Sequence, residues 1–137
     1  MKPQFAVIDV GSNSVRLMLA VEEQGRARSL SKTLGSTRLA TGIDQTHRLA
    51  EDRMEATVST IDAFRKEADR FGIPVLVYAT SAVRDAENRD EFLERVKDQT
   101  GLDVLVLSGE QEGNYAFDAV TGGVEALGGD RKSTRLN

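Results

Sequence analysis

Residues 5–19 read FAVIDVGSNSVRLML, in which two apolar segments flank a short polar insert. A continuous apolar run is typical of a strand buried on both faces, and the Gly, Ser and Asn residues between the runs favour a tight turn. The first run also contains Asp9. Burying an ionised carboxylate costs several kcal/mol unless the group is paired, hydrogen-bonded or bound to metal. The stretch therefore predicts two neighbouring strands and a carboxylate with a partner or a chemical role.

Apolar spacing predicts the remaining elements. Besides residues 5–10, strands are expected at 14–23, 26–34, 75–79 and 102–108, with a hairpin turn at Gln24-Gly25. A helix is predicted over 51–71, ended by Gly72, because apolar residues recur there at spacings of three and four. The residues expected to face the core from this helix are Met54, Val58, Ile61, Phe64, Ala68 and Phe71.

Two more helices complete the predicted order. One covers residues 88–100, with Phe92, Leu93 and Val96 facing inward, and another opens at Ser108, where Ser108 and Gln111 match a capping box. The order β-β-β-α-β-α-β-α predicts an α/β fold in which an antiparallel meander continues into parallel crossover units. The sheet is therefore expected to be mixed.

Composition excludes several classes of function. The 137 residues include no cysteine, which excludes disulfides, zinc-thiolate sites and thiol nucleophiles. A net charge of -4 argues against broad electrostatic binding of nucleic acid. No apolar run approaches the length of about 18 residues that a membrane helix needs, so no membrane partner and a cytoplasmic location are expected. An anionic substrate would have to bind through local donors and a metal ion.

The first candidate motif is D-V-G-S-N-S, Asp9 to Ser14. Gly11, Ser12, Asn13 and Ser14 could cradle a phosphate with backbone amides and hydroxyls, and Asp9 could hold Mg²⁺ or orient water. The alternative is a simple hairpin turn with a solvated aspartate. The position of Asp9 inside an apolar run favours a functional site.

The second motif is Y-A-T-S-A-V-R-D-A-E-N, residues 78–88, which follows a predicted buried strand. Thr80 and Ser81 offer hydroxyl donors and Arg84 offers a guanidinium suited to phosphate. The alternative, which the residues alone favour, is that Arg84 pairs with Asp85 or Glu87 at the surface.

The third motif is S-G-E-Q-E, residues 108–112, again after a buried strand. Capping and the helix dipole account for Glu110 and Gln111. Glu112 lies one position beyond the capping box, where its carboxylate could act as a general base on water. Taken alone, a structural role is favoured here too.

In this order the three motifs resemble the exopolyphosphatase and guanosine pentaphosphate phosphohydrolase family. The family's D-[VL]-G-S-N-S matches Asp9 to Ser14, its A-T-x-A-x-R-x-A block matches Ala79 to Ala86, and its S-G-x-E/Q-E segment matches Ser108 to Glu112. The resemblance runs over residues 4–122 and implies a ribonuclease-H-like half-domain of the actin-like, sugar-kinase-like ATPase superfold. It also implies hydrolysis of a terminal phosphoanhydride bond, with release of orthophosphate from polyphosphate or guanosine pentaphosphate.

The resemblance assigns roles to individual residues. Asp9 would place Mg²⁺ and the attacking water, and residues 11–14 would form the first phosphate loop. Arg84 would hold a phosphate group, and Glu112 would be the catalytic base. A homodimer of the full-length protein is a further expectation from the family.

The sequence also departs from the family pattern. Gly113-Asn114 stand where Ala-Arg usually follows the glutamate, and the second phosphate loop D-x-G-G-G-S is not found after residue 122. Residues 1–127 are therefore interpreted as the N-terminal part of the domain, and this chain is expected to have little activity alone. Residues 128–137 are interpreted either as an appended, non-native tail or as an ordinary frayed C-terminus.

Two other functions stay open. A sugar kinase of the same superfold also begins D-x-G-[ST]-x-S-x-R, which Asp9 to Arg16 satisfies, although the second and third motifs favour the hydrolase. A non-catalytic phosphate or alarmone sensor would keep the loop without turnover.

Overall fold

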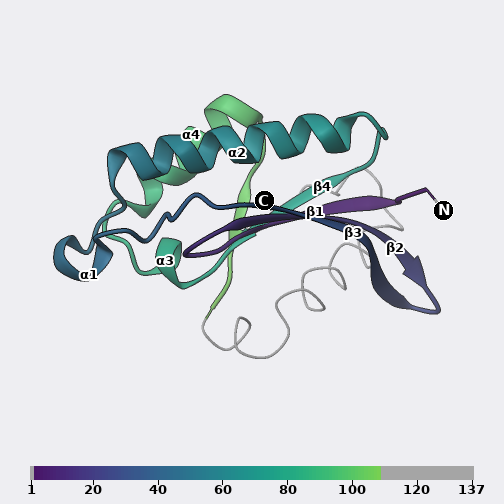
Figure 1. Ribbon diagram of the computed structural model, residues 1–137, viewed down its shortest axis with the longest axis horizontal. Coiled ribbons are helices and arrows are strands. Elements are labelled where there is room, and N and C mark those ends of the chain that lie inside the picture. Colours follow the sequence, from purple (N-terminus) through teal and green to yellow (C-terminus); the bar gives the residue numbers. More distant parts are fainter. Residues whose placement is uncertain (1, 109–137) are drawn as a thin grey trace.

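The computed structural model describes residues 2–108, which build one mixed sheet with helices packed on it (Figure 1). The spatial order of the strands is β3-β2-β1-β4-β5. Their bounds are Phe5–Val10 for β1, Val15–Glu23 for β2, Arg26–Gly35 for β3, Val75–Ala79 for β4 and Val104–Val106 for β5. The helices are α1 (Ile43–Thr46), α2 (Glu51–Asp69), α3 (Ser81–Arg84) and α4 (Arg89–Thr100).

Strand directions confirm the predicted mixed sheet. β1 pairs antiparallel with β2, and β2 antiparallel with β3, which forms the meander. β1 and β4 are parallel, as are β4 and β5. The chain passes from β3 to β4 through α1 and α2, and from β4 to β5 through α3 and α4. The predicted turn between β2 and β3 is also confirmed: Gln24 and Gly25 have φ values of 54° and 76°, the left-handed pair of a two-residue hairpin loop.

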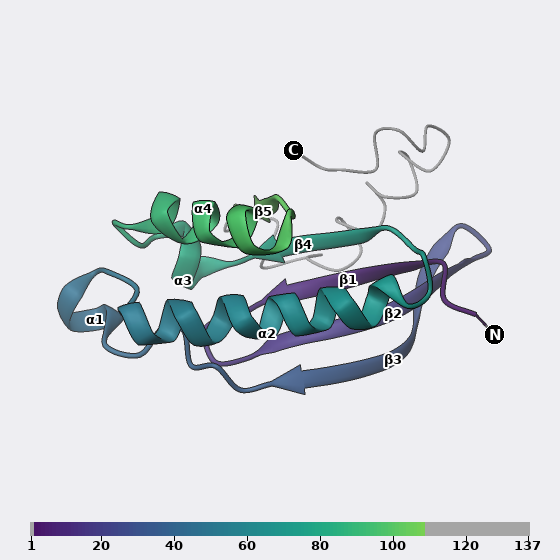
Figure 2. The ribbon, with the colours of Figure 1, turned by 90° about the horizontal axis from the view of Figure 1, so that it is seen from above.

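The two long helices cover one face of the sheet (Figure 2). Because side chains alternate along a strand, this face receives Ala6, Ile8 and Val10 of β1. The helical residues in the same cluster, all predicted to face inward, are Met54, Val58, Ile61, Phe64 and Ala68 of α2 and Phe92 and Val96 of α4. This cluster is the main hydrophobic core.

The prediction that Phe71 faces the core is wrong, because 47% of the residue is exposed. The helix ends at Asp69, and the N–H groups of Arg70 and Phe71 bond to carbonyls only three residues earlier, at Glu67 and Ala68. This tighter winding rotates Phe71 away from the apolar stripe of α2.

The opposite face of the sheet carries a smaller apolar cluster. Its members include Phe5 and Val7 of β1, Met18 of β2 and Tyr78 of β4. By the same alternation, Asp9 belongs to this face. The carboxylate therefore lies on the side of the sheet away from α2 and α4.

Other differences from the predicted elements are local. The one-turn helices α1 and α3 were not predicted, since four residues are too few for a periodic pattern to emerge. The last described strand is confined to Val104–Val106 of the predicted 102–108. The predicted helix after Ser108, the boundary at residue 127 and the 128–137 tail lie outside the described residues.

Candidate active site

The first two motifs, and the start of the third, meet at one edge of the sheet. Val10 pairs with Ala79, and Ala79 pairs with Val106, so the parallel strands β1, β4 and β5 end at the same level. Neighbouring strands lie about 4.8 Å apart, so the residues that follow them start within about 10 Å of one another. Open α/β sheets bind ligands at this carboxyl edge.

The turn of residues 11–14 has a fixed backbone. The N–H of Gly11 donates to the carbonyl of Ser14 at 3.0 Å, and a Cβ atom on Gly11 would lie only 3.1 Å from that oxygen. The turn is also bound from outside, because the N–H groups of Arg38 and Ala40 donate to the carbonyls of Asn13 and Ser12, each at 3.0 Å.

This arrangement leaves donors available at the turn. The carbonyls of Ser12 and Asn13 are occupied by the loop of residues 36–41, whereas their own N–H groups have no hydrogen-bond acceptor within residues 2–108. Successive free N–H groups in a turn form an anion-binding concavity. The turn predicted to cradle phosphate thus has donors for that task.

Asp9 is the buried carboxylate of this edge, with 5% of the residue exposed. The guanidinium of Arg16 donates a hydrogen bond to it from β2. On the other side, Tyr78 of β4 is in register with Asp9. Burial raises the pKa of the Tyr78 hydroxyl, and the negative charge of the nearby Asp9 carboxylate raises that pKa further. Asp9 therefore has the Arg16 guanidinium as its cationic donor, which compensates its burial.

The second motif forms the end of β4 and the helix α3. Thr80 precedes the helix, and its carbonyl accepts the N–H groups of Val83 and Arg84 at 3.1 and 3.0 Å. Ser81 is the first helical residue. The hydroxyl of Thr80 makes no capping bond within the described part of the chain, so it stays available to a ligand.

Arg84 connects the second motif to the start of the third. Its Nη1 donates to the carbonyl of Leu107 at 3.2 Å, just after β5, and its Nε donates to Asp85 at 3.2 Å. The alternative pairing of Arg84 with Asp85 is therefore present in the structure. The bond to Leu107 additionally holds the guanidinium at the sheet edge. Glu112 lies outside the described residues.

Sequence reasoning missed Arg16 as the partner of Asp9, Tyr78 as its neighbour on β4, and the loop of residues 36–41. Register could have identified Arg16, because a short turn centred on residues 12 and 13 places residue 16 opposite residue 9. Residues of the 36–41 loop and Asn13 of the turn line an open pocket of about 340 Å³. Nothing local in the sequence indicates this contact, which depends on the path of the chain after β3.

Metal binding at this edge depends on a single described carboxylate. Within residues 2–108 no group of three or more Asp, Glu or His side chains is placed to hold a metal ion. Mg²⁺ keeps several waters and is commonly bound by one or two carboxylates plus substrate phosphates. Asp9 beside a donor-rich turn fits such an ion when a phosphate substrate completes its coordination.

No helix in residues 2–108 is long and apolar enough to cross a membrane. Comparisons with known proteins identify the family of the chain. The model of the family described as "Ppx/GppA phosphatase family" matches residues 18–129. Exopolyphosphatase 1 of Mycobacterium tuberculosis is 39% identical over 119 residues, which are 85% of this chain and 35% of that protein.

Solved structures are similar as well. A crystal structure of the Aquifex aeolicus member of the Ppx/GppA family superposes with a TM-score of 0.75 at 42% identity, covering 88% of this chain and 40% of the other. An exopolyphosphatase from Cytophaga hutchinsonii gives 0.72 at 28% identity, covering 79% and 35%. The chain thus spans about a third of the length of the curated exopolyphosphatases that it matches.

Proposed function

Because the chain belongs to the Ppx/GppA phosphatase family, we propose that it supplies the phosphate-binding edge of a phosphoanhydride hydrolase. The reaction is release of orthophosphate from the end of inorganic polyphosphate or from guanosine pentaphosphate. The observation that carries this proposal is the register of β1, β4 and β5, which end at the same edge of the sheet. The turn of residues 11–14, the segment with Arg84 and the start of the third motif all follow strands at that edge, and Arg84 bonds the carbonyl of Leu107 there.

In the proposed reaction, the turn and Arg84 bind the terminal phosphate. The N–H groups of Ser12 and Asn13, with the side chains of Ser12, Asn13 and Ser14, donate to its oxygens. Thr80 and Ser81 add hydroxyl donors from the neighbouring strand end. Such fixed donors stabilise the charge that develops on the phosphoryl oxygens, which is the main work in phosphoryl transfer.

Hydrolysis requires water to be oriented and deprotonated. Glu112 takes a proton from the attacking water, whose oxygen forms the new bond to the terminal phosphorus. The bond from that phosphorus to the bridging oxygen breaks, and the bridging oxygen leaves on the shortened chain. Asp9 would hold Mg²⁺, which supplies charge neutralisation when bound.

The test is orthophosphate release with polyphosphate or guanosine pentaphosphate and Mg²⁺. We expect little turnover from the 137 residues alone, and release from a version extended through the family's second phosphate loop. Glu112→Gln in that version should lower release by about a thousandfold or more while binding persists. The matched control is Glu110→Gln, a neighbouring carboxylate assigned to helix capping, which should keep most of the activity.

Other outcomes would point to the alternative functions. Sugar-dependent consumption of ATP would favour a kinase of the same superfold, and tight phosphate binding without turnover would favour a sensor. Robust turnover by the 137 residues alone would contradict the expectation that the chain needs a second loop. Cytoplasmic location and a homodimeric full-length protein remain predictions of the proposal.

A further inference from the structure

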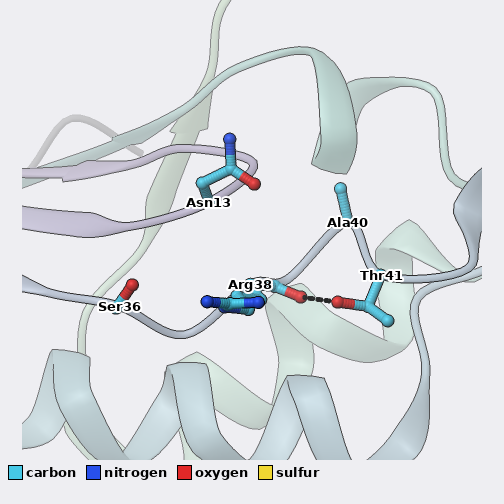
Figure 3. Close-up of a pocket in the computed structure, with 5 residues that line it drawn as sticks. All are labelled: Asn13, Ser36, Arg38, Ala40 and Thr41. Atoms are coloured by element: carbon cyan, nitrogen blue, oxygen red, sulfur yellow. Dashed lines mark hydrogen bonds between the residues drawn. The ribbon is translucent and has the colours of Figure 1, made fainter.

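The pocket beside the turn has the composition of an anion site. Its lining residues are Asn13 from the turn and Ser36, Arg38, Ala40 and Thr41 from the loop that follows β3. Figure 3 shows Asn13 on one side of this space and Ser36 and Arg38 on the other. The lining includes a guanidinium, an amide and two hydroxyls, and no carboxylate. Such a set suits a phosphate oxygen better than a cation.

The backbone of Arg38 is held in an unusual conformation. Its φ of 53° lies in the left-handed region, which a non-glycine residue adopts uncommonly and at a cost. Three hydrogen bonds maintain it: its N–H donates to Asn13 at 3.0 Å, and its carbonyl accepts the N–H of Thr41 at 3.1 Å and the Thr41 hydroxyl at 2.8 Å. The main chain is thus fixed against the turn.

The side chain of Arg38 is exposed, and no hydrogen bond or ion pair joins its guanidinium to another side chain or carbonyl within residues 2–108. The two other arginines of this edge differ, because Arg16 is paired with Asp9 and Arg84 with Asp85. Arg38 therefore contributes the uncompensated positive charge beside the donor-rich turn.

We propose that Arg38 and this pocket form a second anion subsite. In this subsite the Arg38 guanidinium binds a phosphate group that is covalently linked to the terminal phosphate. The terminal phosphate itself lies on the turn of residues 11–14. The inference rests on the proposed function and refines its substrate class: chains of linked phosphates gain affinity at Arg38, and a lone orthophosphate does not. The fork of the guanidinium matches two phosphate oxygens.

The test measures the binding of orthophosphate and of tripolyphosphate to the 137-residue chain by calorimetry, with amide NMR shifts to locate each ligand. Arg38→Asn removes the charge with a residue that tolerates the left-handed conformation, and Arg38→Lys keeps the charge. The matched control is Arg70→Asn, an exposed arginine that caps the far end of α2. Preserved amide dispersion in each variant establishes that it is folded.

We expect Arg38→Asn to weaken tripolyphosphate binding by about tenfold, while orthophosphate binding changes less than about twofold. Arg38→Lys should recover part of the loss, and Arg70→Asn should behave as the unmodified chain.

Equal tripolyphosphate affinity in all four proteins would overturn the inference and leave the proposed function standing. An equal loss for both ligands in Arg38→Asn would also overturn it, because Arg38 would then belong to the terminal-phosphate site. If neither ligand shifts the amides of Ser12 and Asn13 in the unmodified chain, both proposals fail.

Discussion

Arg16 lies directly opposite Asp9 in the antiparallel pair of β1 and β2, and its guanidinium donates a hydrogen bond to the Asp9 carboxylate. The two side chains differ in environment: 46% of the Arg16 side chain is exposed, but only 7% of the Asp9 side chain. The arrangement explains how an apolar strand tolerates a carboxylate, since the charge is matched by a cation that still reaches water. Any metal ion at Asp9 would have to share this carboxylate with Arg16.

We expect Arg16→Gln to lower the free energy of unfolding by about 1–2 kcal/mol. Removing one member of a fully buried pair costs about 3–5 kcal/mol, and the partial exposure of Arg16 reduces that figure. The measurement is urea unfolding followed by circular dichroism. Asp9→Asn combined with Arg16→Gln should lose less than the sum of the single losses, because the pair is coupled.

The control for this pair is Arg28→Gln. Arg28 bonds Glu23 at 2.8 Å across the exposed β2–β3 hairpin, where both side chains are about half exposed. Such surface pairs contribute little, so its loss should be below about 0.5 kcal/mol. Equal losses for Arg16→Gln and Arg28→Gln would show that the Asp9 pair is no more than a surface contact.

Most of the fold could be predicted because it follows from local patterns. The strands β1 to β4, the helix α2 and the helix α4 each carry a continuous or periodic apolar signal, and glycine marks the turn after β2. Packing that joins distant segments leaves no such signal. Asn88, for example, bonds both the N–H and the carbonyl of Leu49, at 2.8 and 3.0 Å, and fixes the chain before α2 to the start of α4.

The candidate site likewise has parts that local sequence predicts and parts that depend on packing between distant segments. The turn of residues 11–14 and the segment of Thr80 to Arg84 could be predicted, because donor-rich residues follow apolar strands. The contact of Arg38 with Asn13 could not, since it depends on how the chain continues after β3 rather than on the motif itself. The register of Tyr78 with Asp9 likewise depends on the parallel pairing of β1 and β4.

Gly35→Ala should destabilise the protein by about 1–3 kcal/mol through overpacking. Gly35 ends β3 beneath α2, and a Cβ atom there would lie 2.8 Å from the Cγ2 methyl of Thr60. The free energy of unfolding in urea measures the loss.

A second change separates this clash from other effects of Gly35. Thr60→Ser removes the methyl group and keeps the hydroxyl, which donates to the carbonyl of Ala56 at 3.0 Å. Added to Gly35→Ala, it should restore most of the lost stability. A double variant as unstable as Gly35→Ala alone would mean that close packing against Thr60 is not the cause.

Thr37→Val should leave stability unchanged or raise it by up to about 1 kcal/mol. The hydroxyl of Thr37 is buried and has no hydrogen-bond partner in the part of the chain that the structure describes. Replacing an unsatisfied buried hydroxyl with a methyl group removes its desolvation cost at nearly constant shape.

The matched comparison for Thr37 is Thr57→Val. Thr57 is equally buried, but its hydroxyl donates to the carbonyl of Arg53 at 2.7 Å. Its replacement should lower the free energy of unfolding by about 0.5–1.5 kcal/mol. If Thr37→Val loses as much as Thr57→Val, a bound water or a further partner satisfies the Thr37 hydroxyl.

Tyr78 should give the protein a specific sensitivity to alkaline pH. Its pKa is raised in the folded protein, first by burial and then by the Asp9 carboxylate. The stabilising effect of the neutral hydroxyl is therefore complete below the ordinary tyrosine pKa of 10.0 and is lost as pH rises above it. Above that value the unfolded chain releases a proton that the folded protein keeps, so unfolding becomes easier by about 1.4 kcal/mol per pH unit.

Comparison with Tyr78→Phe isolates this effect, because all other titrating groups are shared. Near pH 8 the hydroxyl is neutral in the folded and the unfolded protein, so the two stabilities should differ by less than about 1 kcal/mol. Above about pH 10 the unmodified protein should lose stability relative to the variant, because only the unmodified protein carries this additional loss. Urea unfolding of both proteins across this range measures it. Parallel pH profiles would show that the pKa of Tyr78 is the same in the folded and the unfolded protein.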